Sequence, residues 1–91
     1  MGLANTKSAK KRIRIAEKRR LRNKSFKSAM KTKIKKFEAA LETGNTEEIK
    51  AKFMEAYKFI DKVASKGIIH KNAAARRKSR LHKKLNKMLA G

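Results

Sequence analysis

The side chains that could do chemistry in this sequence are almost all cationic. Its 91 residues include 28 Lys and Arg against seven Asp and Glu, which gives a formal net charge of +21. Lys ammonium groups bind phosphate oxygens as point charges, and Arg guanidinium groups bind them through two parallel hydrogen bonds. Because like charges at this density repel one another in a compact chain, the composition predicts a polyanionic partner.

The charges are unevenly distributed along the chain. Residues 1–36 contain fifteen Lys and Arg and a single acid, Glu17. Residues 65–91 contain nine Lys and Arg and no acid, whereas residues 37–64 contain six acids and four Lys. A solvated helix usually pairs its Lys with acids four residues away, and the two ends lack such acids. We therefore predict that both ends bind a polyanion while the middle of the chain forms the core.

No combination of residues predicts catalysis or a bound metal. The two His, His70 and His82, are twelve residues apart, and the sequence has no Gly-rich phosphate loop. No pair of His has the spacing of metal ligands, and no paired carboxylates are predicted in a basic pocket. We predict that the protein is not an enzyme and that it takes neither a cofactor nor a small-molecule substrate.

Length and composition favour one small cytoplasmic domain. A chain of 91 residues can form a single domain with a modest core. The absence of Cys argues against a disulfide-stabilised extracellular protein. No apolar run approaches the roughly 20 residues needed to span a bilayer, and no signal-peptide segment follows the N-terminus. We expect a protein without a membrane partner that does not form homo-oligomers.

Two glycines divide the chain into three predicted helices. The sequence has no Pro, and Gly44 and Gly67 are its only glycines away from the ends. Each can adopt the left-handed conformation that ends a helix. The first helix is predicted from about residue 7 to about residue 43, the second from Asn45, which caps it with Glu48 at capping-box spacing, and the third from about residue 71 to residue 89. Three residues are candidate N-caps of the first helix: Asn5, Thr6 and Ser8.

Apolar residues recur at helical spacing in the second half of the first helix and along both later helices. Before Phe26 this pattern fades, so residues 7–25 are predicted to be a basic part of the first helix that projects from a bundle of residues 26–89. The predicted fold class is all-α, a single domain over residues 1–91 built as a three-helix bundle with a long, extended N-terminal first helix. The predicted core residues are Phe26, Met30, Ile34, Phe37, Leu41, Ile49, Phe53, Ala56, Ile60, Val63, Ala74, Leu81, Leu85 and Met88.

The aromatic residues favour recognition of phosphates over stacking on bases. Phe26, Phe37, Phe53, Tyr57 and Phe59 fall within the predicted bundle and do not alternate with the basic runs. A platform for single-stranded nucleic acid needs aromatic rings exposed among cations. Folded or double-stranded RNA is recognised mainly through its shape and its phosphates, so the pattern predicts recognition of the RNA backbone.

Two segments of the chain resemble a known family. Residues 4–12, Ala-Asn-Thr-Lys-Ser-Ala-Lys-Lys-Arg, and residues 66–81, Lys-Gly-Ile-Ile-His-Lys-Asn-Ala-Ala-Ala-Arg-Arg-Lys-Ser-Arg-Leu, closely resemble the S-twenty family of bacterial small-subunit ribosomal proteins. The resemblance covers essentially the whole chain, including helix lengths and the positions of the glycines. It implies a cytoplasmic ribosomal protein that serves translation within a ribonucleoprotein, binds 16S ribosomal RNA directly and stabilises the packing of RNA helices.

The resemblance also implies which residues face the RNA, because the two matching segments carry the family's motifs. Neighbouring cations on the same predicted helices extend this set. The predicted RNA-binding residues are Asn5, Lys7, Ser8, Lys10, Lys11, Arg12, Arg14, Lys18, Arg19, Arg22, Lys24, His70, Lys71, Asn72, Arg76, Arg77, Lys78, Arg80 and Lys84.

Two other functions stay open on the sequence. Composition alone also permits a nucleoid or histone-like protein that compacts DNA. Residues 1–6, Met-Gly-Leu-Ala-Asn-Thr, depart from the family's usual Met-Ala-Asn start and match an N-myristoylation pattern that is followed by a polybasic run. That pattern would suit a protein of membrane surfaces, whereas an N-terminal extension or a difference in start site is the simpler explanation of Gly2 and Leu3.

Overall fold

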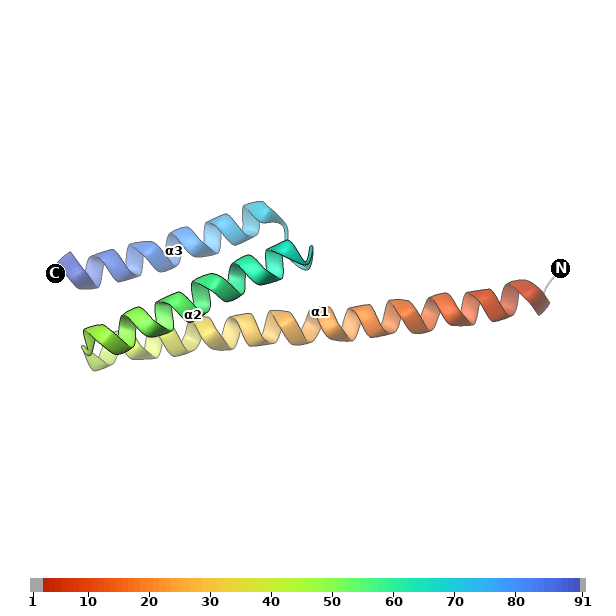
Figure 1. Cartoon of the computed structure of the whole chain (residues 1–91), viewed down its shortest axis with the longest axis horizontal. Coiled ribbons are helices and arrows are strands. Elements are labelled where there is room, and N and C mark those ends of the chain that lie inside the picture. The colour runs from red at the N-terminus through yellow and green to blue at the C-terminus, as the bar shows by residue number, and fades with distance from the viewer. Residues whose placement is uncertain (1–2, 91) are drawn as a thin grey trace.

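The chain forms three helices and, over the residues described, no strand (Figure 1). The structure, a computed structural model, describes the backbone of residues 3–90 and the side chains of residues 8–90. The helices are α1 (Leu3–Thr43), α2 (Thr46–Ser65) and α3 (Lys71–Ala90). The predicted all-α fold with a long first helix is confirmed. The molecule measures 69 × 22 × 13 Å, and α1 lies along its longest dimension.

Helix α1 is continuous over 41 residues and starts earlier than predicted. Asn5, Thr6 and Ser8 all lie inside the helix, so the prediction that one of them is its N-cap was wrong. No Pro or Gly occurs between Leu3 and Thr43, so nothing in this run interrupts the ladder of backbone hydrogen bonds. A polar side chain marks a helix start only where the backbone leaves the helical conformation, and here it does not.

The connection from α1 to α2 uses the predicted glycine and the predicted cap. Gly44 has a φ of +72°, and Asn45 adopts an extended conformation whose Oδ1 accepts a hydrogen bond from the Glu48 N–H at 3.2 Å. In a full capping box the Glu48 side chain would accept a hydrogen bond from the Asn45 N–H. Here the Asn45 N–H donates instead to Thr43 Oγ1 at 3.3 Å. This short connection turns α2 back along α1.

The connection from α2 to α3 is a Schellman motif. Gly67 has a φ of +75° and donates its N–H to the Ala64 carbonyl at 2.9 Å, and the Ile68 N–H donates to the Val63 carbonyl at 3.1 Å. Ile68 is 9% exposed and joins the core from the turn itself, which helical spacing had not indicated. The turn therefore both ends α2 and fixes the start of α3 against the core.

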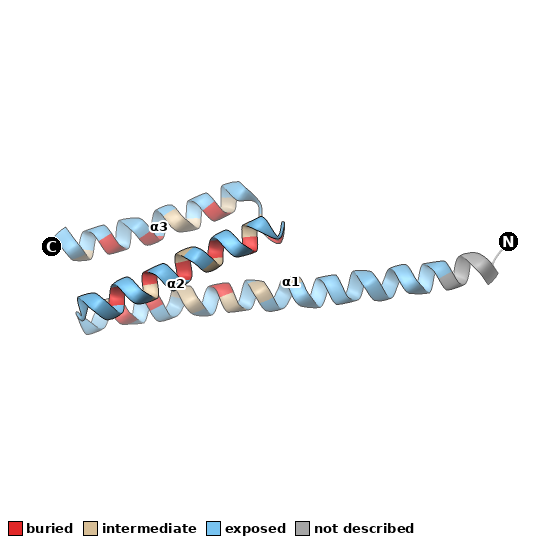
Figure 2. Ribbon diagram, viewed as in Figure 1, coloured by how far each residue is buried: buried red, intermediate tan, exposed pale blue. Residues whose placement is uncertain are grey.

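The core runs along α2, which lies between the other two helices (Figures 1 and 2). Helices α1 and α3 each contact α2 far more than they contact each other, so the bundle is flattened with α2 in the middle. The predicted stripes are confirmed, with Phe26, Ile34, Leu41 and Met88 packed at the margins and half-buried. The buried core residues are Met30, Phe37, Ala40, Ile49, Phe53, Ala56, Ile60, Val63, Ile68, Ala74, Leu81 and Leu85.

The first half of α1 takes no part in this core. Every residue from Ser8 to Arg22 is exposed, including Ile13 at 61% and Leu21 at 56% (Figure 2). Burial begins with Asn23 and Phe26, both half-buried, and becomes complete at Met30. We call residues 8–24 the arm. Its helix has no apolar neighbour among the described residues to hold it.

Candidate nucleic-acid interface

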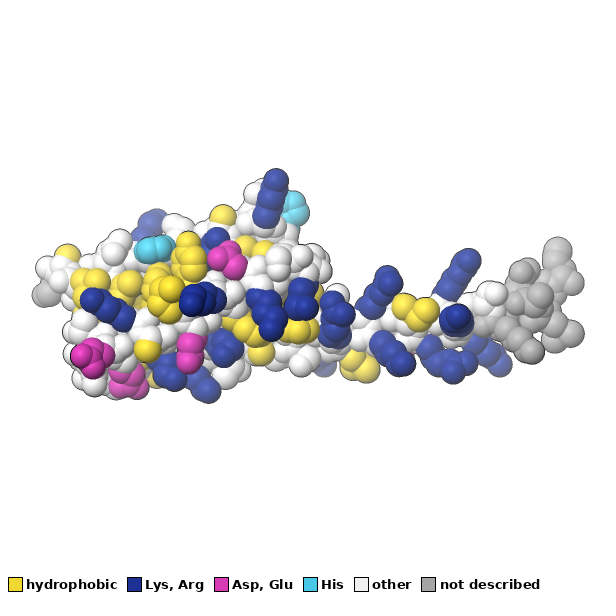
Figure 3. All heavy atoms as spheres, viewed as in Figure 1, with side chains coloured by type: hydrophobic (Ala, Val, Ile, Leu, Met, Phe, Trp, Pro, Cys, Tyr) yellow, Lys and Arg dark blue, Asp and Glu magenta, His cyan; other side chains and the backbone are white. Residues whose placement is uncertain are grey.

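The arm presents cations along its length in the view of Figure 3, and their spacing in the sequence distributes them around the helix. Among its exposed residues Glu17 is the single acid. In an α-helix, residues three and four apart lie beside each other on one face, so Lys11, Arg14 and Lys18 form one row along the helix. The exposed cations of the arm are Lys10, Lys11, Arg12, Arg14, Lys18, Arg19, Arg20, Arg22 and Lys24.

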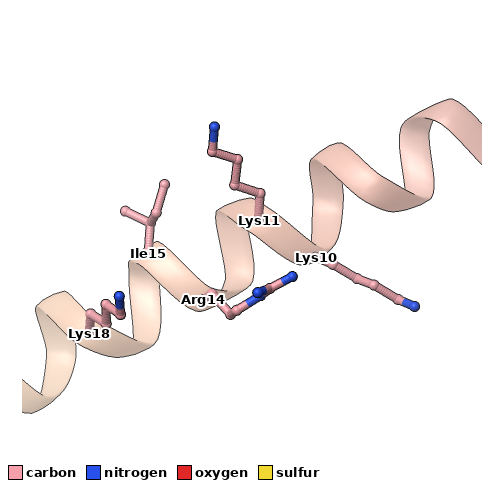
Figure 4. A pocket seen from close by; sticks show the side chains of 5 residues that line it. All are labelled: Lys10, Lys11, Arg14, Ile15 and Lys18. Atoms are coloured by element: carbon pink, nitrogen blue, oxygen red, sulfur yellow. The ribbon is translucent and has the colours of Figure 1, made fainter.

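The side chains of the arm point outward instead of converging on a cavity. In the open hollow beside Lys10, Lys11, Arg14, Ile15 and Lys18, the long side chains fan out from the helix in different directions (Figure 4). An enclosed pocket would suit a small molecule, whereas this geometry suits several separate anionic groups. Asn5 and Lys7, also predicted to bind RNA, lie outside the described side chains, as does the myristoylation pattern at residues 1–6.

Helix α3 provides a second basic surface. Lys71, Asn72, Arg76 and Arg80 are exposed, and Arg77 is half-buried. Arg77 and Arg80 line a hollow of about 140 Å³ between α1 and α3, together with Ile34, Glu38, Leu81 and Lys84. The first residues of α3 lie at the end of the bundle from which the arm projects (Figure 1). The structure thus brings Lys71 and Asn72 closer to the root of the arm than the later cations of α3.

Two of the predicted RNA-binding cations are paired with acids of the bundle. Lys78 Nζ lies 2.6 Å from Asp61 Oδ1 on α2, and Lys84 Nζ lies 3.3 Å from Glu38 Oε1 on α1. The hydrogen bond to Asp61 raises the pKa of Lys78 above its ordinary value; partial desolvation opposes this rise, and the charge of the carboxylate adds to it. Both ion pairs link different helices, and the two paired ammonium groups are less available to a phosphate than an unpaired lysine would be.

His70 caps α3 with its side chain. Its Nδ1 accepts a hydrogen bond from the Asn72 N–H at 3.1 Å, and its carbonyl accepts from the Ala74 N–H at 3.0 Å. The imidazole thus satisfies one of the free N–H groups at the helix start. His82 instead packs edge-on against the rings of Phe53 and Tyr57, at centroid distances of 5.0 and 5.4 Å.

Five residues near the root of the arm form a cluster that the sequence analysis missed. Phe26 and Phe59 stack with their ring centroids 6.1 Å apart and their planes at 29°. Lys33 Nζ lies 5.3 Å from the centroid of Phe59, and Lys62 Nζ and Lys66 Nζ lie 6.0 and 5.4 Å from that of Phe26. Two features of the sequence could have indicated this cluster. Phe26 begins its apolar stripe between the cations Lys24 and Lys27, and Phe59 lies beside the apolar stripe of α2 and not on it.

The described residues lack a cluster of metal-ligating side chains. No group of three or more His, Cys, Asp and Glu side chains lies close enough together within this part of the chain to hold a metal ion. None of the helices described combines the length and the apolar character needed to cross a membrane. The acids visible in Figure 3 lie over the bundle, whereas the charged side chains visible on the arm are cationic.

Comparison with known proteins agrees with this geometry. A family model described as "Ribosomal protein S20" matches residues 4–86. The "Small ribosomal subunit protein bS20" of Clostridium acetobutylicum is 61% identical over 88 residues, which cover 97% of this chain and all of that protein. The proteins of the same name from Clostridium beijerinckii and Halalkalibacterium halodurans are each 58% identical, over 94% and 98% of this chain and 99% and 98% of their own lengths. Because the family model covers most of the chain and the relatives are 58–61% identical over nearly its full length, this chain belongs to the ribosomal protein S20 family.

Proposed function

We propose that this chain binds 16S ribosomal RNA directly and stabilises the packing of RNA helices in the small ribosomal subunit. Family membership makes it a structural, non-enzymatic component of that subunit, at the ribosome in the cytoplasm. The observation that carries the proposal is the arm, a helix whose cations are exposed on every side with Glu17 as the single acid among them. Among the described residues, the three ion pairs all lie within the bundle.

The length of the arm suits contact with more than one RNA segment. At about 1.5 Å per residue, residues 8–24 extend about 25 Å, so cations at opposite ends and on opposite sides can reach different phosphates. A folded RNA brings phosphates of several strands together, and their mutual repulsion opposes its packing. A basic rod between such strands offsets that repulsion, and the exposed cations of α3 contribute from the bundle.

The salt dependence of binding tests this proposal. If the arm and α3 together neutralise about 6–10 phosphates, the logarithm of the association constant for 16S ribosomal RNA should fall against the logarithm of salt concentration with a slope of several units. The measurement is a filter-binding or fluorescence titration at several salt concentrations. A slope near zero would contradict the electrostatic account.

Matched variants locate the effect on the arm. Lys11→Gln and Arg14→Gln each remove one exposed arm cation, and each should reduce the slope by about one unit. Lys50→Gln removes an exposed cation of α2, in the acid-containing part of the chain, and should leave the slope unchanged. Equal reductions in all three variants would mean that net charge alone governs binding.

Competition separates this proposal from the alternative of a DNA-compacting protein. An excess of duplex DNA should displace folded 16S RNA poorly if the arm and α3 fit the arrangement of phosphates in that RNA. A nucleoid protein would instead release the RNA to duplex DNA at comparable concentrations of phosphate, because it would recognise charge density alone.

A further inference from the structure

We propose that Phe26 and Phe59 form a platform on which one unpaired nucleobase of the bound RNA stacks, while Lys33, Lys62 and Lys66 bind the phosphates beside it. The inference rests on the proposed function and adds a base contact to what is otherwise recognition of the RNA backbone. Helical spacing predicts Phe26 as a core residue and leaves Phe59 outside the predicted stripes, so neither ring was expected to contact a base.

The two rings lie at the margin of the core, where they pack against it without being fully buried. Phe37 and Phe53 are 0% and 6% exposed and pack against each other at 5.8 Å, whereas Phe26 and Phe59 are only half-buried. Phe59 precedes Ile60 of the buried stripe and therefore sits at the edge of the face that α2 presents to α1. A large ring at a margin that water reaches leaves apolar surface available to a partner.

The lysines around the rings give the platform its chemical preference. Each of the three ammonium groups lies within 6.0 Å of one ring centroid. They come from α1, from α2 and from the residue that follows α2. Cation–π contacts at exposed sites are weak, and Lys side chains are flexible, so each ammonium can move from the ring to a phosphate at little cost. A nucleotide offers both groups that this cluster can bind, a π-face for the ring and a phosphate for the lysines.

The position of the cluster suits an extruded base. Phe26 lies where α1 leaves the bundle, and Lys66 is the C-cap of α2, just before the turn into α3. RNA running from the arm to the start of α3 would pass this point. A nucleotide that is unstacked at a junction of RNA helices would find its replacement stacking partner here.

Replacing the ring by an aliphatic side chain tests the stacking directly. Phe59→Leu keeps an apolar side chain at the margin and removes the π-face, so affinity for 16S ribosomal RNA should fall roughly 5- to 100-fold. The salt slope should stay the same, because no phosphate contact is lost, and Phe59→Tyr should bind like the unchanged protein. Unchanged affinity in Phe59→Leu would overturn the platform, and failure of the unchanged protein to bind would overturn the proposed function instead.

Tyr57→Leu is the matched control. Tyr57 is also a half-buried aromatic residue of α2 with a lysine over its ring, but that lysine, Lys78, is held by Asp61. Its replacement should leave RNA affinity unchanged. A loss equal to that of Phe59→Leu would show that aromatic packing in general, not stacking at this platform, supports binding, and would overturn the proposal.

Ultraviolet crosslinking gives a result that does not depend on the folding of a variant. Irradiation of the complex of the unchanged chain with 16S RNA should attach a nucleotide to Phe26 or Phe59, located by mass spectrometry of the peptides. Phe37, which is fully buried, should carry none. Crosslinks confined to residues of the arm, with none at Phe26 or Phe59, would overturn the platform.

Discussion

His70 has a structural role in addition to the RNA contact that the family resemblance implies for it. Its Nδ1 caps α3 through the Asn72 N–H, so His70→Ala should lower the free energy of unfolding by about 1 kcal/mol. His70→Asn supplies another capping oxygen and should restore this stability. Urea unfolding followed by circular dichroism measures both variants.

The same two variants separate the cap from an RNA contact. If the imidazole itself touches a phosphate, His70→Asn should remain stable and still bind 16S RNA more weakly. Equal stability of His70→Ala and the unchanged protein would contradict the capping role.

The pair Lys78–Asp61 offers a second test at the level of single residues. The raised pKa of Lys78 means that the pair contributes its stability fully at neutral pH and loses it only as alkaline pH rises through that pKa.

Asp61→Asn removes the negative charge that holds the ammonium. We expect Asp61→Asn to bind RNA more tightly, with a salt slope steeper by about one unit, because Lys78 becomes free for a phosphate.

Glu55 provides the control for this variant. It lies on the same helix as Asp61 and pairs with Lys52 at 3.8 Å, and neither member of that pair belongs to the predicted interface. Glu55→Gln should change the slope less than Asp61→Asn. Indistinguishable slopes for the two variants would indicate that Lys78 does not face the RNA.

At the scale of whole elements, the sequence predicts which residues of α2 are buried but not which side chains are covered at the margins of the bundle. Ile49, Phe53, Ala56, Ile60 and Val63 are buried as their spacing predicts, because α2 packs between two helices and a regular stripe must face them. Helix ends at the two glycines follow from local backbone preference. Both are properties of short stretches of sequence.

Features that depend on how the helices pack could not be predicted in this way. The ion pairs of Lys78 with Asp61 and of Lys84 with Glu38 join different helices and have no local pattern. Whether Phe26 and Phe59 are covered depends on how α1 and α2 pack at the margin, which spacing along one helix does not specify. The start of α1 was missed because capping residues also occur inside helices. The predicted RNA-binding residues stay a prediction at this scale.

We expect folding and RNA binding to depend on different elements, and paired substitutions test this expectation. Ile60→Ala removes a side chain of α2 that is 0% exposed and should lower the free energy of unfolding by about 2–5 kcal/mol. Arg12→Gln on the exposed arm should leave unfolding nearly unchanged and weaken RNA binding. Thermal unfolding and RNA titration of both variants make the comparison. A large loss of stability in Arg12→Gln would mean that the arm packs on the bundle.

At the scale of the whole molecule, the buried core occupies one end of the 69 Å axis and an exposed basic helix the other. One end contains the core and nearly all the acids, and the other is an exposed helix of cations with Glu17 as its one acid among the described side chains. Cations so close together repel one another, and an isolated helix without an apolar face is marginal in water. If the arm binds RNA as proposed, we therefore expect its helical form to gain most of its stability from the phosphates of that RNA.

Hydrogen exchange tests whether RNA holds the arm. In the free protein, amide hydrogens of residues 8–24 should exchange rapidly while those of α2 exchange slowly, because core packing protects α2 and does not extend to the arm. Addition of 16S RNA should slow exchange along the arm and leave α2 nearly unchanged, which makes α2 the internal control. Slow exchange of the arm before RNA is added would contradict coupled ordering, since it would show that the helix is stable without phosphates to neutralise its charge.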